Sequence, residues 1–232
     1  ALGAFLLTRA PSAQYASEDP YTDGYVPPRS IKTLVDRTQE STVTVWCDPK
    51  VGKGGQGTAS AINLGASKSK EYPTTLITNH HVVERCIGVD SELTIALPFK
   101  DPVPAVILKL DKKNDLATLG TNLELPPLKL SENITWPGYW VMALGSADGY
   151  EGSVSFGNVI NTNQSEILIT NNISRGNSGG PLIDNEGFVV GVISWGSEVE
   201  QYSIAKSLDA FCAKMIKCKF DRGKKWWDYS DD

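Results

Sequence analysis

A serine set among glycines is the strongest chemical signal in this sequence. Residues 176–181 read Gly-Asn-Ser-Gly-Gly-Pro, with Ser178 at the centre. A serine hydroxyl becomes a nucleophile only when a base removes its proton and N–H donors stabilise the oxyanion that forms. Flanking glycines allow a tight turn that exposes the hydroxyl and directs backbone N–H groups into the same space. The segment fits such a nucleophile, although a plain glycine-rich turn would have the same composition.

The base that this serine needs can only be one of two adjacent histidines, because the chain contains no others. His80 and His81 lie within Thr-Asn-His-His-Val-Val, residues 78–83. Asp115 opens the apolar run Asp-Leu-Ala-Thr-Leu, where a carboxylate could be buried against an imidazole and fix its tautomer. The alternative for Asp115 is a turn residue that ends the preceding Lys-Lys-Asn loop.

The order of these residues along the chain discriminates between folds. Gly-Asn-Ser-Gly-Gly also fits the nucleophile elbow of α/β-hydrolases, but that fold requires a histidine after the serine and none follows Ser178. The subtilisin order requires an aspartate before the histidine, and Asp36 and Asp48 lie in no convincing context. The order His81, Asp115, Ser178 is that of the chymotrypsin fold.

Most of the chain between these residues consists of short β-type runs separated by Gly, Asn and Asp. We expect strands at 42–47, 57–63, 74–78, 92–97, 105–110, 116–119, 139–144, 153–160, 166–170 and 188–195. Many short strands with turn signals between them indicate an all-β barrel or sandwich. Leu123–Leu128, with two prolines, is the best candidate for a seam between two halves.

The two ends of the chain differ from this pattern. Residues 1–29 form a polar, proline-rich arm, and its apolar start at Ala1–Leu7 could be the end of a signal segment or of a membrane anchor upstream of residue 1. Ser30 is expected to cap a short amphipathic helix. A helical period returns near the other end, from about 203 to 217, before a tail at 221–232. Its apolar face would carry Ile204, Leu208, Phe211, Cys212, Met215 and Ile216.

Composition excludes several classes of protein. The formal net charge of −5 argues against nucleic acid as a partner, because phosphate binding needs a basic face. No apolar stretch approaches the about 20 residues of a membrane span. No metal site and no cofactor is expected from the motifs. Four cysteines could form two disulfides, in three connectivities.

Three blocks of the sequence together resemble the HtrA/Deg-type proteases of the chymotrypsin-like (trypsin-like) serine protease superfamily. They are Thr-Asn-His-His-Val at 78–82, Asp-Leu-Ala-Thr-Leu at 115–119 and Arg-Gly-Asn-Ser-Gly-Gly at 175–180. Ala-Leu-Gly at 143–145 and Gly-Val-Ile-Ser-Trp-Gly at 191–196 fit the strands beside the site. The resemblance covers roughly residues 31–210. It departs in one respect: we expect no carboxy-terminal PDZ domain, and so no control of activity through one.

The resemblance implies a fold and its boundaries. It implies two six-stranded antiparallel β-barrels with a carboxy-terminal α-helix, in one protease domain at 30–220. The first barrel would occupy about 30–124 and the second about 125–200, with the cleft between them and the helix at about 203–217.

The resemblance also implies roles for individual residues. His81 would be the general base, Asp115 its orienting carboxylate and Ser178 the nucleophile. The N–H groups of Gly176 and Ser178 would form the oxyanion hole. His80 would fill a variable position as a solvated neighbour.

Substrate binding would fall to residues on either side of the nucleophile. Asn172 and Ile173 would line the primary specificity pocket, beside Arg175, and an uncharged floor suits a small or medium uncharged side chain. The edge strand at Ser194, Trp195 and Gly196 would pair with the substrate backbone. The six binding residues in this set are Asn172, Ile173, Arg175, Ser194, Trp195 and Gly196.

The cysteines allow one pairing from the resemblance and leave another open. Chymotrypsin-like enzymes often join the regions of Cys47 and Cys86. Cys212 and Cys218 would be about 9 Å apart along a continuous helix, so they can pair only if that helix breaks near Met215.

We therefore expect a serine endopeptidase that cleaves extracytoplasmic polypeptides through an acyl-enzyme, secreted or tethered to the outer face of a membrane. Two alternatives remain: a catalytically silent peptide-binding or chaperone module, and a processing protease for one partner. The polypeptide substrate is the only partner expected besides copies of the chain. Tyr15, Tyr21 and Tyr25 fit either a stalk on a monomer or an arm that forms a trimer.

Overall fold

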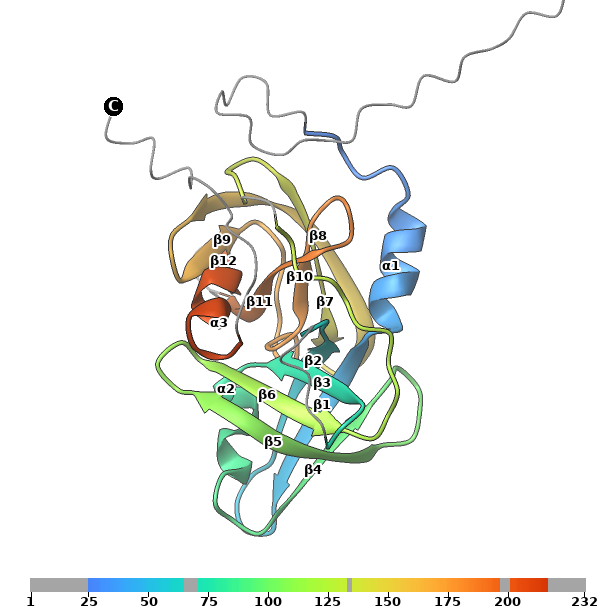
Figure 1. The fold of residues 1–232 in the computed structure, drawn as a ribbon, viewed down its shortest axis with the longest axis vertical. Coiled ribbons are helices and arrows are strands. Elements are labelled where there is room, and N and C mark those ends of the chain that lie inside the picture. The colour runs from blue at the N-terminus through green and yellow to red at the C-terminus, as the bar shows by residue number, and fades with distance from the viewer. Residues whose placement is uncertain (1–24, 65–70, 133–134, 197–200, 217–232) are drawn as a thin grey trace, which may run out of the picture.

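The computed structural model describes residues 25–64, 71–132, 135–196 and 201–216. Its strands form two closed antiparallel barrels of six, which lie one above the other in Figure 1. The fold class expected from the sequence, all-β with two six-stranded barrels and a carboxy-terminal helix, is confirmed. Among the described helices, none is long and apolar enough to cross a membrane.

The first barrel has the strand order β1-β2-β3-β6-β5-β4. Helix α1 precedes it, and the short helices α2 and η3 follow β3. The elements are α1 (Ile31–Gln39), β1 (Thr42–Pro49), β2 (Gly55–Ala61), β3 (Thr74–Thr78), α2 (His80–Val83), η3 (Glu84–Cys86), β4 (Ser91–Ala96), β5 (Val103–Asp111) and β6 (Leu116–Thr121).

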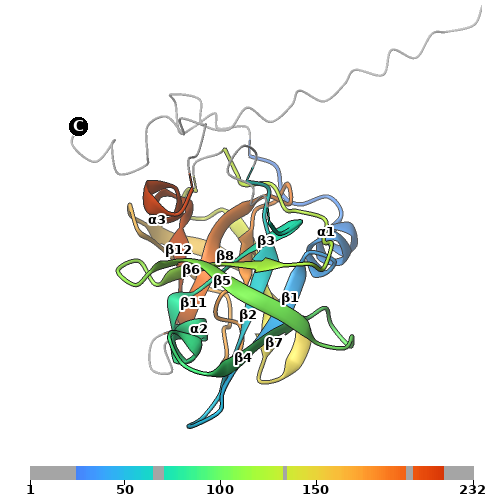
Figure 2. The ribbon, with the colours of Figure 1, turned by 60° about the horizontal axis from the view of Figure 1, so that its bottom comes forward.

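The second barrel has the order β10-β11-β12-β9-β8-β7 and is followed by helix α3. Figures 1 and 2 show α1 and α3 on opposite sides of the molecule. The elements are β7 (Trp140–Ala147), β8 (Tyr150–Thr162), β9 (Glu166–Ile169), β10 (Pro181–Ile183), β11 (Val189–Gly196), β12 (Ser203–Ser207) and α3 (Leu208–Lys214).

The expected start of the last helix is wrong. Residues 203–207 form β12, which pairs with both β11 and β9 and so closes the second barrel. Ile204 lies in β12 and Leu208 in α3, so their spacing of four residues does not reflect a helix. Ser207 marks the true start of α3, because its hydroxyl accepts a hydrogen bond from the N–H of Ala210.

The other helix lies where the sequence placed it, but its expected cap does not form. Ser30 occupies the N-cap position of α1 without a capping hydrogen bond, and its hydroxyl instead donates to Thr33 Oγ1 at 2.7 Å. Just before it, Tyr25 stacks on Tyr139 with ring centroids 4.3 Å apart. The Tyr25 hydroxyl also accepts a hydrogen bond from the N–H of Trp140. Tyr25 therefore packs on the second barrel, while Tyr15 and Tyr21 lie outside the described residues.

Three clusters of buried apolar side chains make up the core of the described residues. One fills each barrel, and the third joins the two barrels to the carboxy-terminal helix. The joining cluster includes Leu116 of β6, Met142 of β7 and Phe211 of α3, each fully buried. The two barrels thus share part of their core.

Candidate active site

The two adjacent histidines have opposite environments at the start of α2. His81 is exposed, with 42% of its side chain accessible, whereas His80 is 9% exposed. The expectation that His80 is solvated is therefore wrong. Helix α2 packs against β2 and β6, so His80, Val82 and Val83 are turned toward the barrel.

The His81 ring is paired with the carboxylate of Asp115. Its Nδ1 lies 2.8 Å from Oδ2 and 3.0 Å from Oδ1, and the backbone N–H of His81 donates to Oδ1 at 3.0 Å. With Nδ1 as the donor, Nε2 carries the lone pair and is free to accept a proton. The pairing thus fixes the tautomer that a general base requires.

Asp115 stays ionised in spite of its partial burial. Burial disfavours the charged form, but hydrogen bonds from the ring and backbone of His81 and from the Ser194 hydroxyl outweigh it and lower the pKa of Asp115. The carboxylate ends the β5–β6 turn at a φ of 53°, which aspartate tolerates better than most residues. The side chain of Asn79 holds this backbone by donating to the Asp115 carbonyl at 2.9 Å.

Ser194, at the end of β11, connects Asp115 with Ser178. Its hydroxyl donates to Asp115 Oδ2 at 2.9 Å, and its carbonyl accepts a hydrogen bond from Ser178 Oγ at 2.7 Å. Although both residues are described, no hydrogen bond joins the Ser178 hydroxyl to the His81 ring. The described geometry therefore has a histidine paired with a carboxylate, and a serine hydroxyl directed at a neighbouring carbonyl.

The loop that carries Ser178 turns at two glycines with positive φ. Gly176 has a φ of 93° and Gly179 a φ of 89°. A Cβ on Gly179 would lie 2.0 Å from the Thr58 carbonyl oxygen, so only glycine fits. Among the described residues, no acceptor binds the N–H groups of Gly176 or Ser178, which leaves both available to an oxyanion.

The β7–β8 hairpin holds the peptide that carries the Gly176 N–H. Its two turn residues, Asp148 and Gly149, have φ values of 47° and 86°, as a type I′ turn requires. The N–H of Asp148 donates to the Arg175 carbonyl at 2.7 Å. Because C=O and N–H point in opposite directions across a trans peptide, this bond directs the Gly176 N–H away from the hairpin.

The expected substrate-binding residues lie on two segments that approach each other closely. Asn172 and Arg175 are exposed, Ile173 is half-buried, and 44% of Trp195 is exposed. A Cβ on Gly196 would lie 2.8 Å from the Ile173 carbonyl oxygen. The space between these two residues is therefore narrow.

The strand beside that space has one free backbone edge among the described residues. Strand β10 pairs with β11 only as far as Val192, whereas β12 continues to pair with β11 up to Gly196. Trp195 and Gly196 therefore pair with β12 on one side only, which leaves their other side for an added strand. Ser194, at the register shift before them, has its carbonyl bonded to the Ser178 hydroxyl.

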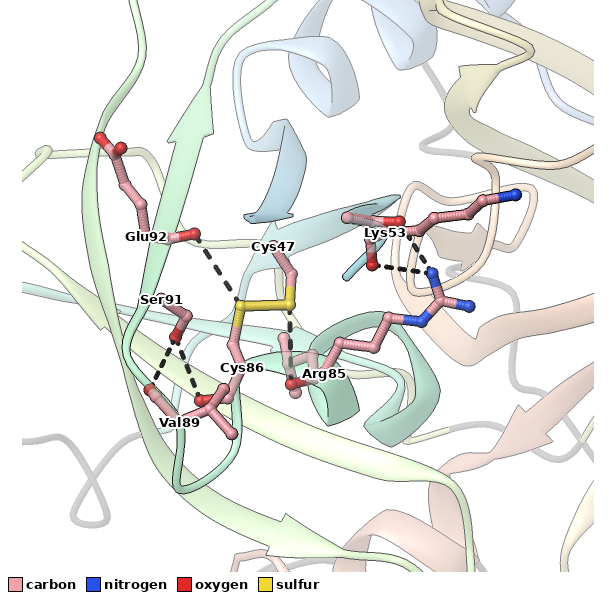
Figure 3. The surroundings of a disulfide bond; sticks show 9 residues. Cys47, Lys53, Arg85, Cys86, Val89, Ser91 and Glu92 are labelled. Atoms are coloured by element: carbon pink, nitrogen blue, oxygen red, sulfur yellow. Dashed lines mark hydrogen bonds between the residues drawn. A yellow bond between two sulfur atoms is a disulfide. The ribbon is translucent and has the colours of Figure 1, made fainter. Parts of the chain in front are cut away.

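A disulfide joins the helical segment after His81 to the first strand (Figure 3). Cys47 and Cys86 are bonded, with Cα atoms 5.8 Å apart, which is the pairing that the resemblance implies. Arg85 adds a second connection, because its guanidinium donates to the Lys53 and Gly54 carbonyls of the β1–β2 hairpin. Cys212 is also disulfide-bonded, and α3 ends at Lys214, next to the expected break; Cys218 lies outside the described residues.

The sequence did not indicate the contacts of three residues near this site. They are Thr58, Asp148 and Ser194, whose hydroxyl binds Asp115. The Asp-Gly pair at 148–149 is a hairpin signal that places a turn. Nothing local in the sequence indicates what the other two side chains contact, because their partners are more than 70 positions away.

Comparison with known proteins places this arrangement in a family. Residues 59–192 match the family described as "Trypsin-like peptidase domain". A protein of Pseudomonas fulva named "Probable periplasmic serine endoprotease DegP-like" is 32% identical over 157 residues, which cover 63% of this chain and 32% of that protein. Human "Serine protease HTRA3" is 33% identical over 135 residues, covering 50% and 30%. Such matches span about a third of the relatives' length.

Solved structures share the fold. The Rv3671c protease from M. tuberculosis in its active form aligns with a TM-score of 0.69 and 22% identity, covering 95% of each chain. The serine endoprotease from Yersinia pestis aligns with a TM-score of 0.66 and 22% identity, over 82% of this chain and 66% of that one. The family match at residues 59–192 includes the serine loop, the paired histidine and strands of both barrels, and the chain belongs to the trypsin-like peptidase family.

Proposed function

We propose that this protein is a serine endopeptidase of the HtrA type, with Ser178 as nucleophile, His81 as general base and Asp115 as the carboxylate that orients it. The observation that carries the proposal is the continuous set of hydrogen bonds from His81 through Asp115 and Ser194 to Ser178. This set links residues of both barrels, and its His81–Asp115 pair is the one that acyl transfer needs to orient the base.

Acylation begins when the Ser178 hydroxyl leaves the Ser194 carbonyl and turns to Nε2 of His81. The hydroxyl turns by rotation about the Cα–Cβ bond of Ser178, and catalytic hydrogen bonds often tighten only when substrate is bound. Ser178 Oγ then forms a bond to the scissile carbonyl carbon while its proton passes to Nε2. The oxyanion of the tetrahedral intermediate binds the N–H groups of Gly176 and Ser178.

The intermediate collapses when His81 returns that proton to the leaving amine as the C–N bond breaks. A water molecule, deprotonated by the same Nε2, then attacks the acyl carbon, and the carboxylate product leaves Ser178 protonated again. Asp115 stabilises the imidazolium in both halves, and its lowered pKa keeps it charged for this role.

The substrate is an extended polypeptide that adds to the free edge of Trp195 and Gly196. We expect a small or medium uncharged side chain before the scissile bond. A ring inserted between Gly196 and Ile173 would need about 3.5 Å on each of its faces. The close approach of these two segments does not allow that spacing. Asn172 has no charge with which to bind lysine or arginine.

We propose that the enzyme acts outside the cytoplasm. The Pseudomonas relative is named as periplasmic, and a disulfide between Cys47 and Cys86 persists in an oxidising compartment.

Labelling with a fluorophosphonate tests the assignment. Ser178 should react and be found by peptide mapping, and both Ser178→Ala and His81→Ala should lose peptide turnover by at least about 10³-fold. His80→Asn is the matched control, because it changes the neighbouring histidine, which has no hydrogen bond to Asp115.

A catalytically silent peptide-binding module would give the opposite result. The wild-type protein would then remain unlabelled and would bind unfolded casein without cleaving it. Loss of activity in His80→Asn with retention in His81→Ala would show that the base is assigned to the wrong residue.

A further inference from the structure

Thr58, on β2 of the first barrel, reaches across to the serine loop of the second. Its side chain is completely buried, with an exposed fraction of 0%. The hydroxyl donates to the carbonyl of Gly176 at 2.6 Å and accepts from the N–H of Ser146 at 3.0 Å. Its backbone N–H donates to the Ser178 carbonyl at 2.8 Å. One threonine thus contacts both residues whose N–H groups face the oxyanion.

The Gly176 carbonyl belongs to the second of the two peptide planes that flank this glycine. The peptide before Gly176 is fixed by the bond from Asp148 to the Arg175 carbonyl. The peptide after it is held by the Thr58 hydroxyl at 2.6 Å and, more weakly, by the bond from the Asn177 N–H to the Ser174 carbonyl at 3.2 Å. Gly176 has a φ of 93°, where glycine has more freedom than any other residue, so its conformation depends on these bonds, of which that from Thr58 is the shortest.

Ser146 completes the connection between the barrels. Its own hydroxyl is 2.5 Å from Thr44 Oγ1 on β1, and both side chains are buried. A Cβ on Gly176 would lie 2.2 Å from the Ser146 carbonyl oxygen, so the glycine packs directly on this residue. Hydrogen bonds therefore connect Thr44 to Ser146, the Ser146 N–H to Thr58, and Thr58 to the Gly176 carbonyl.

We propose that Thr58 is a positioning residue for the oxyanion hole, which holds the Gly176 N–H in the orientation that binds the tetrahedral intermediate. The inference rests on the proposed function. Thr58 touches no reacting atom, and it acts through Gly176 and Ser146. The first barrel would then contribute to oxyanion binding as well as supplying the base.

The alternative is that Thr58 only satisfies two buried backbone groups. Valine separates these readings, because it has nearly the same shape as threonine but no hydroxyl. In Thr58→Val the Gly176 carbonyl and the Ser146 N–H both lose their partner, which costs stability in either case. Only a positioning role also predicts a selective loss of transition-state binding.

The experiment compares Thr58→Val and Thr58→Ser with the wild type and with Thr42→Val. Thr42 is a matched control, because its buried hydroxyl also donates to a backbone carbonyl, that of Thr38 at 2.7 Å, on the side of α1. Each variant is assayed for kcat and KM on a peptide substrate, for binding of a peptide boronate, which forms a tetrahedral adduct with serine, and for melting temperature.

We expect Thr58→Val to lower kcat by about tenfold or more with KM within about twofold, since a misdirected oxyanion donor loses part of its effect. Boronate affinity should fall by the same factor. Thr58→Ser should recover most of both, and Thr42→Val should lose melting temperature without losing kcat. Thr58→Ala also removes the hydroxyl and should show the same loss of kcat and boronate affinity as Thr58→Val.

A Thr58→Val protein that loses melting temperature but keeps kcat and boronate affinity would overturn the inference. So would a Thr58→Ser protein as impaired as the valine variant. Failure of the proposed function looks different: the wild type itself would then show no turnover, no fluorophosphonate label on Ser178 and no boronate adduct.

Discussion

Asp115 carries a negative charge and also orients the His81 ring, and substitution can separate these two contributions. Asparagine in its place keeps the size and lacks the charge that, in the proposed mechanism, stabilises the imidazolium of His81. Its amide can also donate to Nδ1, which favours the wrong tautomer of His81. We expect Asp115→Asn to lower kcat by about 10⁴-fold with little change in KM.

Asp111 provides the comparison for that variant in steady-state assays. Asp111 is buried at the end of β5, four residues before Asp115. It accepts hydrogen bonds from the backbone and side chain of Asn114. Asp111→Asn should retain kcat within a few fold. Equal losses in the two variants would mean that turn integrity matters and that the charge on Asp115 does not.

Asp184 is the buried carboxylate with the opposite behaviour. It is 7% exposed in the β10–β11 turn, and burial raises its pKa to about 6 in spite of hydrogen bonds from Ser131 and from the N–H groups of Glu186 and Phe188. The folded state therefore binds a proton more tightly than the unfolded state. The resulting stability is fully present below pH 3.8 and is lost as the pH rises through about 6.

This linkage predicts how Asp184→Asn changes the free energy of unfolding. Asparagine does not titrate, so the wild type should gain about 2 kcal/mol relative to the variant between pH 7.5 and pH 4. Urea unfolding of both proteins at several pH values measures the difference. A constant difference across that range would show that Asp184 has an ordinary pKa in the folded state.

The β7–β8 hairpin is a small element whose turn holds the loop that carries Ser178. Gly149 has a φ of 86°, so alanine there should cost about 1–3 kcal/mol of strain and shift the Asp148 N–H that holds the Arg175 carbonyl. Gly138, with a φ of 91° and open space around it, is the control outside this hairpin. We expect both alanine variants to lose stability and only Gly149→Ala to lose kcat as well, by calorimetry and peptide turnover. Equal kcat values in the two variants would exclude a role for the hairpin.

The elements that could be predicted form from local sequence patterns, whereas the others depend on contacts between distant parts of the chain. Strands with their own β-type runs were predicted to within a few residues, as for Thr74–Thr78. Strand β10 was missed because Pro181–Ile183 is three residues long and adjoins a glycine loop. For β12 the helical spacing of apolar residues predicts a helix, but pairing with β9 and β11 makes the segment a strand. The motif residues could be predicted from their types and order, whereas Thr58 contacts the site only through the folded chain.

The two barrels share one cluster of buried side chains, which bears on how the molecule unfolds. Leu116 belongs to the joining cluster and Leu119, on the same strand, to the core of the first barrel alone. Both are fully buried, so truncation to alanine should cost about 2–5 kcal/mol in each case. We expect Leu116→Ala to reduce hydrogen-exchange protection in both barrels, and Leu119→Ala mainly in the first. Unchanged protection of β10 and β11 in Leu116→Ala would show that the barrels unfold independently.

The bond between Cys47 and Cys86 also makes a covalent ring of the chain between them, and His81 lies inside it. A protease that cuts itself, or is cut by a neighbour, anywhere from residue 48 to residue 85 would still be a single molecule. Its mass on a non-reducing gel would not change, and the fragment with the nucleophile would remain tethered to the one with the first strand. Nicked molecules could thus continue to turn over substrate, and damage within the ring would become visible only after reduction.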